Sequence, residues 1–262
     1  PLMIETLCKR LQAAEKEGPD AVRAITGPNL RRVYAGGAHL DPYYIGAMEA
    51  FGIEVYEGYG MSECSPTISS NTEEGAKPGS VGRPLGNIEA RFENGELQVR
   101  GSSVMKGYFR NEDATKECFD GDWFRTGDLG TMDANGYVTI TGRKKSLIVN
   151  REGKNIYPEE IEQLINRSPL VAESLALGYK VGDETGERVG LIVQADEEKL
   201  EGSGEPKSRW DNLVTREIER ICKLGLAAYK IPRKIIVRHI PFELTSTMKV
   251  KRVRYNGSLD EK

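Results

Sequence analysis

Residues 31–63 contain the pattern that most limits how this chain can fold: a strand, a glycine loop, a helix and a second strand, in that order. The expected elements are strands at 31–35 and 53–56 and, between them, a helix that is capped by Asp41, begins at Pro42 and ends at Gly52. Such a unit forms a right-handed crossover between parallel strands. Ligands of open α/β sheets bind beyond the carboxyl ends of the strands, so Gly36-Gly37-Ala38 and residues 58–63 are expected to open on the same side.

The string Tyr59-Gly60-Met61-Ser62-Glu63 has the chemistry of a nucleotide site. A tyrosine ring can stack on a purine, and Gly60 lets the backbone approach a ligand closely. Ser62 offers a hydroxyl to a phosphate oxygen, and Glu63 offers a carboxylate to Mg²⁺. The alternative for so short a string is a glycine-rich turn with an incidental carboxylate.

Residues 123–145 combine an acid, basic residues and a change of pattern. Asp128 lies in an expected loop, and Asn135-Gly136 predicts a two-residue hairpin turn with positive φ angles. Gly142-Arg143-Lys144-Lys145 then ends the β pattern. We therefore expect a nucleotide-holding acid, an arginine and a domain hinge within this stretch.

At 262 residues the chain is long enough for two ordinary domains. The predicted fold class is α/β and α+β, with a partial parallel βαβ sheet and a small antiparallel β layer followed by a separate compact α+β domain. The first domain is expected at 1–142, with the βαβ unit at 31–63 and the β-rich part at 79–141. The second is expected at 143–262, with the hinge at 143–145.

The remaining expected elements follow from apolar periodicity, caps and turn residues. In the first domain they are a helix at 3–17, a hairpin turn at Asn94-Gly95, strands at 96–100 and 104–109, and a helix from Asn111 to Cys118. In the second they are strands at 146–150, 172–178, 188–195 and 235–240, helices from Pro158 and at 209–224, and a loop at 196–208.

Composition excludes several classes of function. A net charge of −3 and a pI near 5.7 remove the simplest electrostatic case for nucleic-acid binding, which would need a basic face, and the local basic clusters are short. The four cysteines are far apart, which indicates neither a zinc site nor a disulfide framework and favours a reducing, cytoplasmic location. His39 and His239 are the only histidines, so a histidine metal site is not expected. No apolar run is long enough to cross a bilayer, whereas peripheral membrane contact and the oligomeric state stay open.

Five motifs, in this order, resemble those of the adenylate-forming superfamily, which contains acyl-CoA synthetases, adenylation domains of peptide synthetases and luciferases. They are Tyr59-Gly60-Met61-Ser62-Glu63, residues 95–101 with Lys106-Gly107-Tyr108, residues 124–129, Gly142-Arg143-Lys144-Lys145, and residues 245–252. Residues 142–149 and 153–162 look most like those of bacterial long-chain fatty-acid CoA ligases.

The resemblance implies a two-step ligation. A carboxylate attacks the α-phosphate of Mg·ATP and expels pyrophosphate, and the thiol of coenzyme A then attacks the acyl-adenylate and releases AMP. The resemblance assigns Gly36, Gly37, Ala38, Tyr59 and Gly60 to the adenine, Asp128 to both ribose hydroxyls, Ser62 to the α-phosphate and Glu63 to magnesium.

In the second domain the resemblance implies a rotation between the two steps. It places Arg143 near the ribose or phosphate, Lys145 at the hinge, Lys249 against the α-phosphate in the first step only, and Gly153-Lys154-Asn155 on the face used for thioester formation. Taken singly, Lys145 is equally an ordinary linker residue, and Lys249 a solvated surface lysine.

Two departures from the family pattern are visible. Met248 stands where a glycine usually precedes the lysine, and no Ser/Thr/Gly-rich phosphate loop is present, since Gly79-Ser80-Val81-Gly82 lacks the following lysine and helix. In the family that loop and most of the acyl pocket precede an element like Gly36–Ala38. We therefore expect the C-terminal half of a ligase, beginning inside a longer protein at Pro1 and unable to form acyl-adenylate alone.

Two other hypotheses keep part of this interpretation. The parent protein could load the pantetheine of a carrier protein instead of free coenzyme A. Alternatively, the chain could be a non-catalytic nucleotide-binding module.

Overall fold

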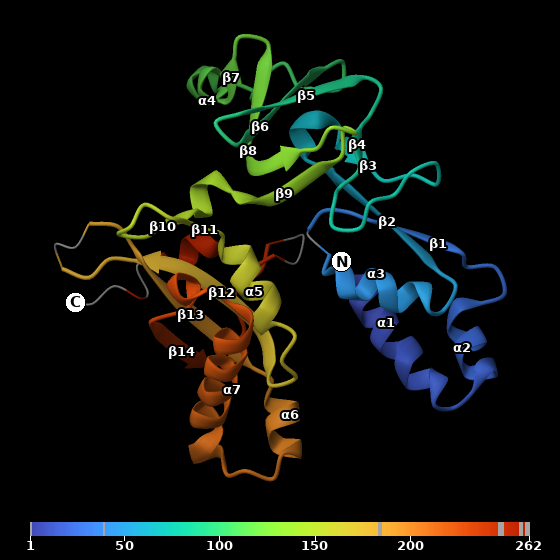
Figure 1. Ribbon diagram of the computed structural model, residues 1–262, viewed down its shortest axis with the longest axis vertical. Coiled ribbons are helices and arrows are strands. Elements are labelled where there is room, and N and C mark those ends of the chain that lie inside the picture. The colour runs from blue at the N-terminus through green and yellow to red at the C-terminus, as the bar shows by residue number, and fades with distance from the viewer. Residues whose placement is uncertain (1, 39, 183–184, 246–248, 257–258, 260–262) are drawn as a thin grey trace. The chain divides into compact units, whose positions relative to one another are not determined.

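The computed structural model describes residues 2–38, 40–182, 185–245, 249–256 and 259. The chain folds as two compact units, Pro1–Ile140 (unit 1) and Thr141–Lys262 (unit 2) (Figure 1). The sequence prediction placed its boundary between residues 142 and 143, two residues further along.

Unit 1 begins with helices that cover a small mixed sheet. The elements are α1 (Leu2–Glu15), α2 (Pro19–Thr26), β1 (Arg32–Ala35), α3 (Pro42–Glu49), β2 (Glu54–Gly60), η1 (Ser62–Cys64), β3 (Thr67–Ser70) and β4 (Arg83–Pro84). Strands β1 and β2 are parallel, and β3 and β4 continue the sheet in antiparallel sense. Asp41 caps α3 by accepting the Tyr43 N–H at 2.9 Å. The predicted βαβ unit is confirmed.

The second sheet of unit 1 is antiparallel. It contains β5 (Ile88–Glu93), β6 (Glu96–Gly101), β7 (Phe119–Asp120), β8 (Trp123–Met132) and β9 (Val138–Arg143), with helix α4 (Glu112–Cys118) preceding β7. Asn94 and Gly95 both have positive φ angles, of 50° and 78°, so the two-residue turn predicted between β5 and β6 is confirmed. Asn111 caps α4, as its sequence position indicated.

Three local predictions in unit 1 were wrong. Residues 104–109 form no strand, because their backbone groups bond elsewhere: the Met105 N–H to the Glu63 carbonyl and the Tyr108 N–H to the Thr115 hydroxyl. The Asn135-Gly136 turn has a positive φ angle only at Gly136, because the carboxylate of Asp133 accepts two backbone N–H groups and closes a longer loop. Residues 123–128, expected as a loop, belong to β8.

Unit 2 is a three-stranded sheet with helices packed against one face. Its elements are η2 (Lys144–Ser146), β10 (Ile148–Val149), β11 (Asn155–Ile156), α5 (Pro158–Ile165), β12 (Val171–Tyr179), β13 (Arg188–Ala195), α6 (Glu197–Gly202), η3 (Lys207–Arg209), α7 (Trp210–Gly225), η4 (Ala228–Lys230), β14 (Lys234–Arg238) and η5 (Arg252–Arg254). The strand order is β12-β13-β14, antiparallel and then parallel. The predicted loop at 196–208 was wrong in part, because Asp196 caps the short helix α6.

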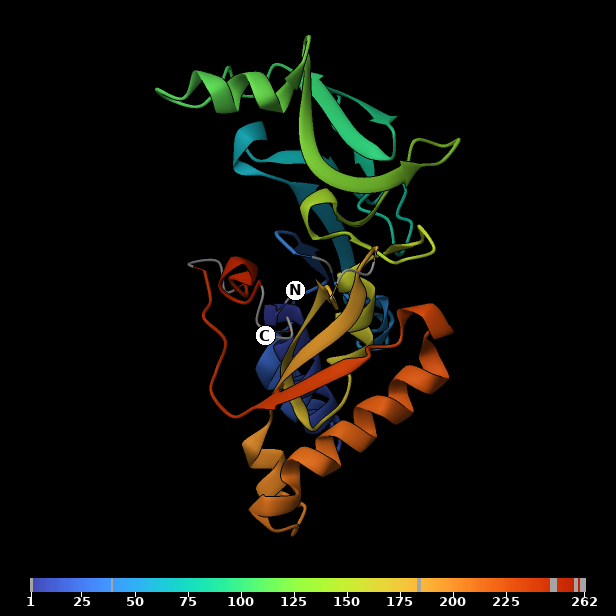
Figure 2. The same cartoon turned by 90° about the vertical axis from the view of Figure 1, so that its left-hand side faces the viewer.

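The two faces of this sheet are covered by different parts of the chain. Helices α5 and α7 bury one face, around Ile161, Leu191 and Ile218 (Figure 2). The C-terminal segment buries the other, where Phe242 packs with residues of β12 and β13. The segment that carries Lys249 is therefore attached to the sheet on the face opposite the helices.

Candidate functional site

The loops after β1 and β2 lie side by side. Ala35 pairs with Glu57 in the parallel register, so both chains leave the sheet at the same edge. A Cβ atom added at Gly36 would lie 3.4 Å from the Gly58 carbonyl oxygen, and Gly37 has a φ angle of +83°. The structure thus brings together the two glycine loops that the sequence predicted to share one side.

Strand β2 continues to Gly60 at a point where no side chain fits. A Cβ atom at Gly60 would lie 1.9 Å from the Pro66 carbonyl oxygen, a distance that no real contact allows. The chain then turns through η1, which exposes Ser62 and buries Cys64. Burial raises the pKa of the Cys64 thiol to about 11, so this thiol stays protonated and unreactive.

Glu63 is held by a residue to which the sequence assigned no role. The Tyr108 hydroxyl donates a hydrogen bond to Glu63 Oε1 at 3.0 Å, and the Met105 N–H donates to the Glu63 carbonyl at 2.7 Å. Burial, together with the bond to Glu63, raises the pKa of Tyr108 to about 12. Tyr108 therefore remains a hydrogen-bond donor throughout the physiological pH range.

The donor set around Glu63 suits a metal that arrives with its substrate. The described residues contain no group of three His, Cys, Asp or Glu side chains that could hold a metal ion. Mg²⁺ in nucleotide sites is commonly bound through one or two carboxylates together with phosphate oxygens and water. A single carboxylate at Glu63 fits that pattern and does not suit a resident metal.

Asp128 occupies a bulge in β8. Glu96 pairs with Leu129 and Gln98 with Arg125, so residues 126–128 of β8 all lie opposite Leu97 alone. The bulge includes Gly127 at a φ angle of +73° and is fixed by the Thr126 hydroxyl, which donates to the Leu97 carbonyl at 2.8 Å.

The Asp128 side chain is buried against a tyrosine. Asp128 is only 2% exposed, and the Tyr59 hydroxyl donates a hydrogen bond to its Oδ2 atom. The structure thus joins two residues that sequence reasoning assigned to the same nucleotide but not to each other. In this state the Tyr59 hydroxyl occupies an acceptor position on Asp128 Oδ2.

The predicted site residues of unit 2 lie on exposed turns. Arg143 ends β9, and Lys145 lies in the single 3-10 turn η2. Asn150 shapes the next turn by accepting the N–H groups of Glu152 and Lys154 at 3.0 and 2.9 Å.

Lys154 combines an ion pair with an aromatic contact. Its ammonium lies 3.1 Å from Glu152 Oε2 and 4.6 Å from the centroid of the Tyr229 ring. Gly153 beside it has a φ angle of +72°.

Lys249 is exposed on the returning side of a hairpin. Its N–H donates to the Thr245 hydroxyl at 3.1 Å, and its carbonyl accepts the Thr245 N–H at 2.7 Å. Met248, whose replacement of glycine was noted in the sequence, lies outside the described residues, as does His39.

Comparison with known proteins agrees with this arrangement. The family of AMP-binding enzymes matches residues 1–109. The long-chain-fatty-acid–CoA ligase FadD15 of Mycobacterium bovis is 37% identical over 254 residues, which cover 88% of this chain and 41% of that relative. The chain belongs to the adenylate-forming, AMP-binding superfamily. The family resemblance deduced from the motifs is confirmed, and the chain spans 41% of the length of this curated relative.

Solved structures of the superfamily share the fold. The o-succinylbenzoate CoA synthetase of Bacillus subtilis, in complex with its acyl-adenylate intermediate, is 28% identical with a TM-score of 0.74, covering 96% of this chain and 49% of that one. The same enzyme with ATP and magnesium ion is 27% identical with a TM-score of 0.73, covering 94% and 49%. The predicted fold class is confirmed.

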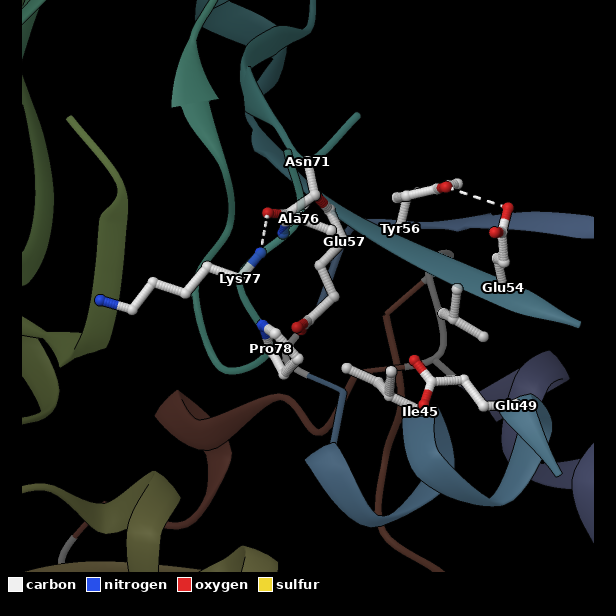
Figure 3. Close-up of a pocket in the computed structure, with 10 residues that line it drawn as sticks. Ile45, Glu49, Glu54, Tyr56, Glu57, Asn71, Ala76, Lys77 and Pro78 are labelled. Atoms are coloured by element: carbon white, nitrogen blue, oxygen red, sulfur yellow. Dashed lines mark hydrogen bonds between the residues drawn. The ribbon is translucent and has the colours of Figure 1, made fainter. Parts of the chain in front are cut away.

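A cavity of about 160 Å³ in unit 1 is separate from these superfamily motifs (Figure 3). It lies between β2, α3 and the loop at 71–78, and no predicted site residue lines it. Glu57 faces this cavity. Burial raises the pKa of its carboxyl to about 7, although hydrogen bonds from the backbone N–H groups of Leu40 and Gly79 lower the pKa in part. We assign this cavity no part in the nucleotide site.

The described residues also bear on membrane insertion. Among them, no helix combines the length and the apolar character that crossing a bilayer requires.

Proposed function

We propose that the chain supplies the AMP-holding part and the lysine-bearing C-terminal domain of an AMP-forming acyl-CoA ligase. The reaction joins a carboxylic acid to the α-phosphate of ATP, releases pyrophosphate, and then transfers the acyl group to the thiol of coenzyme A. A long-chain fatty acid is the proposed acid, supported by the name of the FadD15 relative and by the motifs at 142–149. The proposed location is the cytoplasm.

In unit 1 the proposed roles follow the edge where β1 and β2 end. Gly36, Gly37 and Ala38 border the adenine, and the Tyr59 ring stacks on it, with Gly60 leaving room for the backbone. Asp128, an acceptor-only carboxylate, takes the ribose hydroxyls once the Tyr59 hydroxyl has moved away. Ser62 donates to the α-phosphate. Magnesium, held by Glu63 and the phosphates, would offset their negative charge.

In unit 2 the proposed roles are electrostatic and conformational. Lys249 stabilises the charge that builds on the α-phosphate in the first step, a preorganised contribution of about 2.7–4 kcal/mol in comparable sites. Arg143 adds a second positive fork near the ribose or phosphate. Lys145 lies at the hinge that withdraws Lys249, and Gly153 and Lys154 lie on the face used for thioester formation. The chain by itself is proposed not to form acyl-adenylate, because its sequence contains no phosphate loop.

One observation supports this proposal most: the meeting of Tyr59 and Asp128. They are 69 positions apart, on strands of two different sheets, and the family resemblance assigned both to the nucleotide. A site that binds an adenine ring and its ribose needs those two groups within the length of one nucleoside. The hydrogen bond between them satisfies that requirement.

The test is a calorimetric titration of AMP, and of a nonhydrolysable acyl-adenylate analogue, against the chain. Asp128→Ala is expected to weaken AMP binding at least tenfold, because hydrogen bonds to a charged group contribute about 1.5–3 kcal/mol each. Asp113→Ala is the matched control, since Asp113 is an exposed carboxylate in the first turn of α4. Far-ultraviolet circular dichroism establishes that both variants fold. Equal affinity of wild type and Asp128→Ala would contradict the ribose assignment.

A further inference from the structure

The segment that carries Lys249, here called the hairpin, is described at residues 243–245 and 249–252, and these two sides are paired along their backbones. Leu244 and Val250 form an antiparallel bridge, and the Lys251 N–H donates to the Glu243 carbonyl at 2.9 Å. Since these bonds fix the two sides against each other, the direction in which Lys249 projects depends on how the base of the hairpin is attached to unit 2.

Arg252 provides that attachment at the end of the hairpin, three residues after Lys249. Its Nη2 atom lies 2.6 and 2.5 Å from the two carboxylate oxygens of Glu162 in α5. Its Nη1 atom donates to the Ala176 carbonyl in β12 at 3.0 Å, while the Ala176 N–H donates to Glu162 Oε1 at 2.7 Å. A single guanidinium therefore joins the hairpin to a helix and to a strand.

This ion pair is more buried than the pairs that Lys251 and Arg254 form, and Arg252 Nη2 also lies 3.9 Å from Oε1 of Glu159, whose side chain is 28% exposed. The side chains of Arg252 and Glu162 are 25% and 15% exposed. By contrast, Lys251 and Arg254 approach Glu243 at 3.8 and 3.5 Å, with all three side chains at least 44% exposed. Exposed pairs of that kind contribute little, whereas removing one partner of a buried pair leaves an uncompensated charge.

The charge and the hydrogen bonds around Glu162 also indicate that this carboxylate depends on Arg252. Burial raises the pKa of Glu162, the Arg252 guanidinium and the Ala176 N–H oppose that rise, and the nearby Glu159 carboxylate adds to it, so that the pKa is raised to about 7 in all. The two groups that the hairpin and β12 supply thus favour the ionised carboxylate against the effect of burial. A lysine in place of Arg252 would keep the charge but lose the planar fork.

The hairpin also has an apolar attachment. Phe242 packs edge to face on Tyr255 at 5.1 Å, and its N–H donates to Gln194 Oε1 at 3.1 Å. Apolar packing has little directional preference, whereas a guanidinium with three fixed acceptors determines orientation. The two attachments therefore have separable effects, one on docking and the other on orientation.

We propose that Glu162 and Arg252 are positioning residues for Lys249: their ion pair locks the base of the hairpin to α5 and β12, so that the lysine moves only as part of unit 2. The value of this lock for catalysis rests on the function proposed above. The lock itself is a property of unit 2 and is measurable without any substrate.

The test is hydrogen exchange of the 262-residue chain, followed by mass spectrometry of peptides that cover 243–252. Glu162→Gln and Arg252→Gln are expected to increase exchange in these peptides at least tenfold and to leave β12, β13 and α7 unchanged. The double variant is expected to exchange no faster than either single variant, because both remove one interaction. Arg252→Lys is expected to restore protection in part.

Glu160→Gln is the matched control. Glu160 lies on the same helix and pairs with Lys230 at 2.6 Å, away from the hairpin. It is expected to match wild type.

Two results would overturn the proposal. One is unchanged exchange at 243–252 in both single variants. The other is a loss of protection throughout unit 2 in Arg252→Gln, which would show that the pair stabilises the whole unit. Should Glu162→Gln fail to fold, Arg252→Gln and Arg252→Lys still decide between these outcomes. Failure of the AMP titration with normal exchange results would refute the proposed function and leave the lock intact.

Discussion

The substitution Tyr59→Phe separates the two interactions of Tyr59, the packing of its ring and the hydrogen bond of its hydroxyl. The ring packs in unit 1 beside Cys64 and Ile68, whereas the hydroxyl donates to the buried carboxylate of Asp128. The substitution keeps the ring and removes the donor. Since Asp128 is only 2% exposed, water cannot freely replace that donor. A hydrogen bond to a charged group contributes about 1.5–3 kcal/mol, so the free energy of unfolding is expected to fall by about that amount.

The same substitution has the opposite expected effect on the ligand. In wild type, the Tyr59 hydroxyl competes with a ribose hydroxyl for Asp128 Oδ2 under the proposed function, and in Tyr59→Phe that competitor is gone. AMP affinity is therefore expected to be unchanged or up to about tenfold higher, since about 1.4 kcal/mol corresponds to a factor of ten. The assays are urea unfolding followed by tryptophan fluorescence, and calorimetric titration with AMP.

Tyr56→Phe is the matched control for Tyr59→Phe. Tyr56 lies in the same strand and also donates to a carboxylate, that of Glu54 at 3.0 Å, but Glu54 is 55% exposed and water can take over. Its loss of stability is expected to be smaller than that of Tyr59→Phe, with AMP affinity unchanged. Two results refute the reasoning: a Tyr59→Phe chain as stable as wild type, or one that binds AMP tenfold more weakly, which would mean that the hydroxyl presents Asp128 to the ligand.

Two further predictions concern backbone packing and a titrating contact. Gly60→Ala is expected to destabilise the chain by about 1–3 kcal/mol, because the new Cβ would lie 1.9 Å from a backbone oxygen. Gly46→Ala, which has open space around it in α3, is expected to stabilise the chain by about 0.5–1 kcal/mol. Equal urea midpoints for the two variants would contradict this prediction. The pKa of His239 is raised in the folded state, mainly by the hydrogen bond to Asp211 and secondarily by Glu197. The stability that the protonated His239 contributes is therefore complete below the unfolded-state pKa of about 6.5 and is lost as the pH rises through the folded-state pKa. Because the His239 side chain is 37% exposed, His239→Asn is expected to lower the free energy of urea unfolding by less than about 1 kcal/mol at about pH 6, and by a smaller amount at about pH 8. A loss of stability that grows with pH would exclude the contact of His239 with Asp211 as its source.

The sequence predicted those parts of the fold that local patterns determine. The bounds of β13 match the predicted strand at 188–195, because an apolar run there stands between polar segments. The caps at Asp41 and Asn111 are as expected, because a cap depends on a side chain and a backbone N–H two or three residues away. Such signals involve residues within one turn of the chain, so they do not depend on the tertiary structure.

The contacts that define the candidate site are not local, and the sequence did not predict them. Tyr59 meets Asp128 across 69 positions, and Glu162 meets Arg252 across 90. The strand predicted at 104–109 was wrong for the same reason, since its backbone bonds to Glu63 and Thr115 instead of a neighbouring strand. Once residues 123–132 are recognised as a strand, one signal follows: a carboxylate buried in a strand, as Asp128 is, must find a donor inside the protein.

The donors that these two buried carboxylates have found account for their different proposed roles. Glu162 binds a guanidinium and a backbone N–H, and no hydroxyl of a substrate could replace that cation without leaving a buried charge uncompensated. Asp128 accepts from the neutral hydroxyl of Tyr59, and a ribose hydroxyl is the same kind of donor. Replacing the Tyr59 hydroxyl by a ribose hydroxyl exchanges one neutral donor for another, whereas replacing the Arg252 guanidinium at Glu162 by a hydroxyl would remove a positive charge. On this argument the first carboxylate is suited to bind a ligand reversibly, and the second is suited to hold the lysine hairpin in place.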